Sequence, residues 1–104
     1  MDNKVVDSIL NLEQNELAAL ATIIATRGST PQKLGAQILF FRDGRTAGTI
    51  GGGCGEAEAR RHAWQVIESG KPALIEINLT HETAEEDGMV CGGTMEIFIE
   101  PVLE

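Results

Sequence analysis

Residues 36–70 read AQILFFRDGRTAGTIGGGCGEAEARRHAWQVIESG, and this stretch decides the fold class. Two runs of apolar and β-branched residues, 36–41 and 45–50, flank the turn 42–44, whose Asp-Gly pair is typical of hairpins. A glycine-rich run follows, and then residues 56–69 repeat their apolar positions at helical spacing. This order of strand, turn, strand and helix predicts a helix packed against a hairpin.

The helix at 56–69 carries its own boundary signals. Glu56 and Glu58 lie in its first turn, where the helix dipole favours acidic side chains. Gly70, with Pro72 just beyond, is a standard helix stop. One face of the helix is apolar and is formed by Ala59, Ala63, Val66 and Ile67. We expect this face to be buried against the sheet.

The rest of the chain predicts one more helix and three more strands. Residues 3–15 space their apolar side chains as an amphipathic helix does, and residues 17–26 are apolar enough for a strand buried on both faces. Alternation over 75–79 and 95–99 indicates two half-buried strands. The order α-β-β-β-α-β-β predicts a single α+β domain over residues 1–104, with two main helices packed on a mixed sheet of about five strands.

The composition excludes several classes of protein. Eight Lys and Arg against 16 Asp and Glu give a formal net charge of −8, which argues against a nucleic-acid binder. No apolar run reaches the roughly 18 residues of a membrane span, and the first residues do not resemble a signal peptide. We therefore expect a cytoplasmic protein without membrane contact. Two cysteines are too few for a disulfide framework.

Glycine gathers around the cysteines, above all in the run Gly51-Gly52-Gly53-Cys54-Gly55 just before the second helix. A helix N-terminus presents unpaired N–H groups and the positive end of the dipole, so this turn is a candidate site for an anion such as phosphate. A tight strand-to-helix turn that needs glycine and binds nothing is the alternative. The run is not a P-loop, because no Lys-Ser/Thr follows it.

Cys54 lies at or just before the start of that helix, where a thiolate is stabilised and the sulfur can act as a nucleophile or a soft ligand. The alternative is a small, buried apolar residue. Cys91 precedes the pair Gly92-Gly93, and core packing explains it equally well. The cysteines and histidines contain no close pair of the kind that structural zinc uses; they are Cys54, His62, His81 and Cys91.

A polar loop follows the buried strand at 17–26. Arg27, Ser29, Thr30 and Lys33 supply two positive charges and two hydroxyls, the groups that recognise oxyanions. The alternative is a solvated connection whose charges offset those of an acidic protein.

Three segments together resemble the signature blocks of one family. They are residues 25–31 (ATRGSTP), 51–56 (GGGCGE) and 91–101 (CGGTMEIFIEP), and their order and spacing are similar to those of the N-terminal domain of the XdhC/CoxI family. The resemblance covers nearly the whole chain. It implies a chaperone, not an enzyme, that binds the molybdenum cofactor (molybdopterin). Such a chaperone protects the cofactor during sulfuration and delivers it to a xanthine-dehydrogenase-like molybdenum hydroxylase.

Carried onto this chain, the resemblance implies that the glycine turn faces the cofactor and that Cys54 is a candidate contact to molybdenum. The implied cofactor-binding residues are Arg27, Ser29, Thr30, Gly51, Gly52, Gly53, Cys54, Gly55, Cys91, Gly92 and Gly93. The implied partners are the hydroxylase and a sulfurtransferase. Many family members continue into a Rossmann-like second domain, so a separate subunit or a homo-oligomer is expected to complete the pocket here.

Two other functions stay open. One is an enzyme that uses Cys54 as a nucleophile for sulfur or selenium transfer to the cofactor; the absence of a base near Cys54 in the sequence disfavours it. The other is a regulatory interaction module that has lost its ligand, which the glycine-flanked cysteine disfavours.

Overall fold

The computed structural model describes residues 3–12, 17–30, 32–51, 55–79 and 92–102. The elements follow one another in the expected order. They are α1 (Asn3–Leu10), β1 (Ala18–Arg27), β2 (Gln37–Phe41), β3 (Thr46–Gly48), α2 (Glu56–Ser69), β4 (Ala73–Asn78) and β5 (Thr94–Val102). The predicted α+β class, the two helices and the five strands are confirmed.

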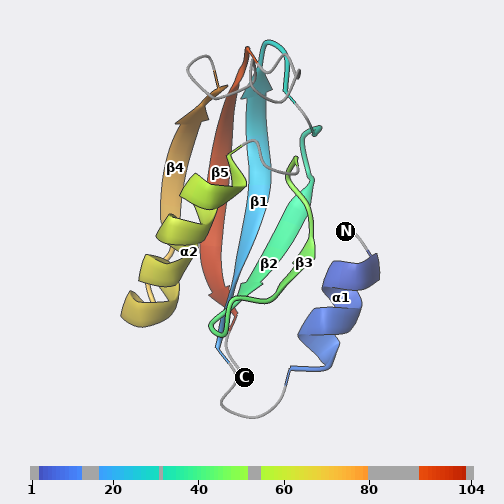
Figure 1. Cartoon of the computed structure of the whole chain (residues 1–104), viewed down its shortest axis with the longest axis vertical. Helices are drawn as coiled ribbons and strands as arrows, with labels where there is room; N and C mark the ends of the chain where they lie inside the picture. The colour runs from blue at the N-terminus through green and yellow to red at the C-terminus, as the bar shows by residue number, and fades with distance from the viewer. Residues whose placement is uncertain (1–2, 13–16, 31, 52–54, 80–91, 103–104) are drawn as a thin grey trace.

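The sheet has the order β3-β2-β1-β5-β4, and all its neighbouring strands pair antiparallel (Figure 1). The expectation of a mixed sheet is therefore wrong. The helical connection β3-α2-β4 joins strands that point the same way. It carries the chain from one edge of the sheet to the other, so β3 and β4 lie at opposite edges and never pair in parallel.

The two helices pack on opposite faces of the sheet, and Figure 1 shows α2 in front of it. On one face, α2 packs over the larger core, whose fully buried members include Ile23, Ile77 and Ile97. On the other face, α1 covers a smaller cluster that contains Val5 and Leu39. Because α1 contacts mainly β2 and β3, the β4–β5 part of its face is left open, and Leu74 of β4 is 63% exposed there.

Helix α2 has the predicted bounds and the predicted buried face, formed by Ala59, Ala63, Val66 and Ile67. It ends at Gly70, which adopts a left-handed conformation (φ 72°) and donates its N–H to the Val66 carbonyl at 2.8 Å. The cap and the apolar spacing therefore agree, which fixes both the length and the rotation of the helix.

Three elements depart from the sequence prediction. Helix α1 ends at Leu10 rather than at residue 15, and the Leu12 N–H bonds the Ile9 carbonyl in a tighter turn; residues 13–15 lie outside the described residues. Strand β3 covers only part of the expected 45–50. Strand β1 is buried on both faces only in its first half, and Ile24, at a bulge in the pairing with β5, is 44% exposed.

None of the described helices is long and apolar enough to cross a bilayer.

Candidate functional site

The three signature segments meet at one end of the sheet. Strand β1 ends there at Arg27 and β5 begins there at Thr94 (Figure 1). Gly55, just before α2, lies near Met95 of β5. Arg27 and Thr94 are direct partners in the antiparallel register. This end of the sheet is the candidate functional site.

The loop after β1 and the turn before β5 touch backbone to backbone. A Cβ on Gly93 would overlap the carbonyl oxygen of Arg27 and would lie 2.5 Å from that of Ser29. Gly28, with φ +71°, faces the same contact, since a Cβ there would lie 3.2 Å from the Gly93 Cα. Glycine is needed at position 93 because the neighbouring atoms belong to the main chain and cannot rotate away. The remaining signature segment, residues 51–56, lies near this contact because its Gly55 packs against β5.

Gly55 allows the start of α2 to pack closely against the sheet. It is buried, has φ +81°, and a Cβ on it would lie 3.1 Å from Ile77 Cγ2 and 3.4 Å from Met95 Cε. Met95 follows Thr94 in β5, so the glycine turn and the Gly93 contact lie within a few residues of each other along one strand. As the N-cap of α2, Gly55 offers no side-chain cap, which leaves the first-turn N–H groups without that partner.

The Glu56 side chain links the start of α2 to the end of the hairpin by hydrogen bonds. Its Oε2 accepts hydrogen bonds from Thr49 Oγ1 at 2.8 Å and from the Ile50 N–H at 3.3 Å. Sequence reasoning gave Glu56 only a dipole interaction and missed this clamp. The available signal was a hydroxyl and a carboxylate at the two ends of a glycine-rich turn.

Replacing Glu56 by alanine is expected to lower the free energy of unfolding by about 1–2 kcal/mol, because two hydrogen bonds to the hairpin are lost. Glu58→Ala is the matched control, since it removes a carboxylate from the same helical turn and should change stability by less than about 0.5 kcal/mol. Urea denaturation followed by circular dichroism measures both. Equal losses in the two variants would mean that the dipole, and not the clamp, explains Glu56.

The predicted site residues of the polar loop after β1 differ in how accessible they are to a ligand. Arg27 is the register partner of Thr94. Strand alternation therefore directs the Arg27 side chain to the face opposite α2, away from the glycine turn. Ser29 is exposed and makes no hydrogen bond within the described part of the chain. The Thr30 hydroxyl donates to the Gln32 carbonyl at 2.9 Å, so its proton is already used. Ser29 is therefore the donor of this loop best placed for a ligand.

The glycine turn is described only at its two ends. Gly51 is buried and donates its N–H to Thr49 Oγ1 at 3.0 Å, so an anion cannot use that group. Gly92, in the facing turn, is exposed and has open space where a Cβ would be. The other predicted site residues lie outside the described residues; they are Gly52, Gly53, Cys54 and Cys91.

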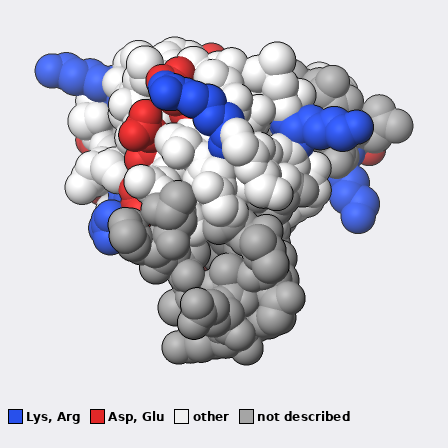
Figure 2. Space-filling model, turned by 90° about the horizontal axis from the view of Figure 1, so that it is seen from above, with Lys and Arg blue, Asp and Glu red and all other residues white. Residues whose placement is uncertain are grey.

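Seen from above, the described part of this end carries separate Lys and Arg side chains, with Asp and Glu beside those on the left and mostly uncharged surface elsewhere (Figure 2). Among the described residues, no group of three or more His, Cys, Asp and Glu side chains is arranged to hold a metal ion. His62 is half-buried on α2 and forms no hydrogen bond or ion pair with Glu58. His81 lies outside the described residues.

Three curated proteins are similar to this chain. YqeB of Escherichia coli (strain K12) is 40% identical over 87 residues, which are 84% of this chain and 16% of that protein. A probable xanthine dehydrogenase subunit of Bacillus subtilis (strain 168) is 32% identical over 95 residues, 89% of this chain and 29% of that protein. PaoD of E. coli (strain K12), a molybdenum cofactor insertion chaperone, is 41% identical over 58 residues, 56% of this chain and 18% of that protein.

A solved structure has the same fold. A xanthine dehydrogenase from Bacillus halodurans superposes with a TM-score of 0.77 at 30% identity, covering 94% of this chain and 29% of that one. The chain thus spans less than a third of the length of each of these relatives. Residues 11–78 match the family described as XdhC and CoxI. With that match across most of its length and with relatives of this identity, the chain belongs to the XdhC and CoxI family.

Proposed function

We propose that this chain is a cytoplasmic carrier of the molybdenum cofactor, which binds the cofactor at the β1–β5–α2 end of the sheet and passes it to a molybdenum hydroxylase. The observation that carries the proposal is the meeting of the three signature segments at that end, two of them in backbone contact. The name of PaoD, a molybdenum cofactor insertion chaperone, supports the choice of cargo.

The residues at this end suit an anionic pterin. The uncapped first turn of α2 offers N–H groups to a phosphate, and Ser29 adds a hydroxyl. Gly92 lets a flat ligand approach the backbone, because nothing lies within 4 Å of the position that a Cβ would take. Cys54, just before Gly55, supplies a thiol for a soft metal centre. These groups bind and shield the cofactor; the hydroxylase performs the chemistry.

The proposal includes protection of the cofactor while a sulfurtransferase sulfurates it. Small-molecule sites bury most of their ligand, frequently at a boundary between domains or subunits. A second protein surface would therefore complete the enclosure of the pterin at this end of the sheet. A further domain, a second copy of the chain or the recipient hydroxylase supplies that surface.

The test is a transfer assay. The chain is loaded with molybdenum cofactor and mixed with cofactor-free hydroxylase, and the recovered hydroxylase activity is compared with that from the same amount of free cofactor. We expect the loaded chain to give the higher activity, and Cys54→Ser to weaken cofactor binding about tenfold, or about 1.4 kcal/mol. Cys91→Ser is measured alongside it, because Cys91 is the other candidate cysteine of the site. Equal recovery from free and loaded cofactor would refute the carrier role, and turnover of a substrate by the chain alone would favour an enzyme.

A further inference from the structure

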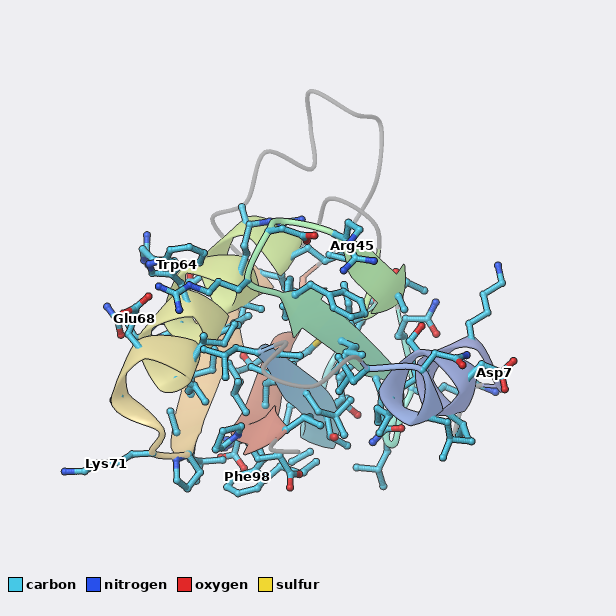
Figure 3. All side chains as sticks on the ribbon, turned by 90° about the horizontal axis from the view of Figure 1, so that it is seen from below. Asp7, Arg45, Trp64, Glu68, Lys71 and Phe98 are labelled. Atoms are coloured by element: carbon cyan, nitrogen blue, oxygen red, sulfur yellow. The ribbon has the colours of Figure 1, made fainter. Side chains whose placement is uncertain are left out.

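Trp64 is an exposed residue that the fold does not use. It is the only tryptophan of the sequence, and it is 48% exposed. The buried face of α2 is formed by other residues, and Trp64 is not part of the core. Figure 3 shows it on the outer side of α2, whereas Phe98 lies on the opposite face of the sheet. Tryptophan is among the most buried residues on average, so an indole left open on a helix is informative.

Trp64 and Arg60 stand between two shallow hollows. One hollow, of about 300 Å³, lies between α2 and the β2–β3 turn; its surface is mainly apolar, and Arg42 and Asp43 also line it. The other, of about 350 Å³, lies along α2 beside Arg61. Both include Arg60 and Trp64 in their walls. A ridge with a hollow on each side can interdigitate with apolar side chains of another protein.

Arg60 is held in place before anything binds. Its Nη1 donates to the Gly44 carbonyl at 2.9 Å, and its guanidinium lies 5.4 Å from the centre of the Phe40 ring. Trp64 lies one helical turn further along α2. A guanidinium fixed in this way loses little conformational entropy when it meets a partner.

The neighbouring charges leave this surface positive. Arg42 pairs with Glu68 at 3.4 Å, and Arg45 pairs with Asp43 at 2.7 Å. Hydrogen bonds from the Arg45 backbone N–H and then from its side chain hold the pKa of Asp43 below its ordinary value, so this carboxylate stays ionised. Within the described part of the chain neither Arg60 nor Arg61 forms an ion pair. Two arginines that form no ion pair there therefore flank Trp64 in a chain of net charge −8.

We propose that Arg60, Arg61 and Trp64 form a docking surface for an acidic patch, with an apolar residue at its centre, on the molybdenum hydroxylase that receives the cofactor. The identity of this partner rests on the proposed function. The occupant is acidic because the two free charges are positive, and it is a protein because tryptophan and arginine anchor protein interfaces.

The position suits delivery. Trp64 lies nine residues after Gly55, a distance of roughly 14 Å along the helix axis. A typical interface covers about 800 Å² of each partner. A hydroxylase bound at Trp64 thus also lies beside the candidate cofactor site. It contacts the domain there without occupying the turns that bind the pterin.

Because the chain has one tryptophan, 5-fluorotryptophan labelling gives a single ¹⁹F resonance that reports on this surface. Unlabelled, cofactor-free hydroxylase is titrated into the labelled 104-residue chain. We expect the resonance to shift to a saturating value. Calorimetry should show that Trp64→Ala and Arg61→Glu each weaken binding at least about 30-fold, with affinity falling as salt rises. Lys71→Glu, which makes the same charge change just beyond α2, is the control and should bind as the wild type does.

Each contrary result is decisive. Wild-type affinity in Arg61→Glu and Trp64→Ala, or no shift of the resonance, overturns the docking surface. A shift that depends on the concentration of the chain alone overturns it in favour of self-association. Pterin binding is measured separately on the same variants and should be unchanged. A chain that docks through Trp64 but binds no pterin would instead refute the carrier function and leave the docking surface standing.

Discussion

Gly93→Ala is expected to lower the free energy of unfolding by at least about 2 kcal/mol, whereas Gly92→Ala should change it by less than about 0.5 kcal/mol. The two glycines are adjacent, yet their surroundings differ. A methyl group on Gly93 overlaps the Arg27 carbonyl oxygen and presses on that of Ser29, while one on Gly92 meets nothing within 4 Å. The loop after β1 must move before Gly93→Ala can fold.

Urea denaturation of the two variants, followed by circular dichroism, measures this difference directly. Because the displaced loop carries Ser29, the folded fraction of Gly93→Ala should also bind pterin more weakly than the wild type does. Similar stability of the two variants would show that the loop and the turn are not in contact, and the proposed binding end would lose its main structural support.

The second large effect is expected at Gly55, with Gly70 as the matched control. Both glycines flank α2 with positive φ, 81° and 72°, so alanine at either position costs about 1–2 kcal/mol in backbone strain. At Gly55 the added Cβ also presses on Ile77, whereas at Gly70 it meets open space. We therefore expect a total loss of about 2–4 kcal/mol for Gly55→Ala, because the start of α2 must lift from the sheet.

Pterin affinity separates the two variants further. Gly55→Ala displaces the first turn of α2, where the phosphate is proposed to bind, so its affinity should fall. Gly70→Ala acts at the far end of the helix and should leave affinity unchanged. An equal fall in both variants would indicate that overall destabilisation, and not the position of the helix start, controls binding.

The sequence predicted best those elements for which several local features indicate the same bounds. Helix α2 has the predicted bounds because its acidic first turn, its apolar spacing and Gly70 all indicate the same limits. Helix α1 was predicted too long because Leu12 continues the apolar spacing. The structure buries Leu12 after the helix has ended, in a turn closed on Ile9. Periodicity cannot distinguish a buried helical residue from a buried residue in the turn that follows.

The pairing of distant segments was beyond the sequence pattern. The strand order that brings Thr94 beside Arg27 depends on where the crossover places β4, and no local motif encodes that placement. The side of the sheet on which Arg27 lies follows from the same register. The Glu56 clamp was missed for a related reason, since its partners Thr49 and Ile50 lie across a turn whose path the sequence does not specify.

The central position of β5 has a consequence for the newly made chain. Strand β1 pairs with β5 along its length, so the middle of the sheet can form only after residues 94–102 have been synthesised. Until then β1 has only β2 as a neighbour and presents an unpaired, apolar edge. Pairings between strands so far apart in sequence form slowly and expose such edges to other chains. During synthesis at the ribosome, the stretch from β1 to β4 is therefore the part of this protein most in need of protection from aggregation.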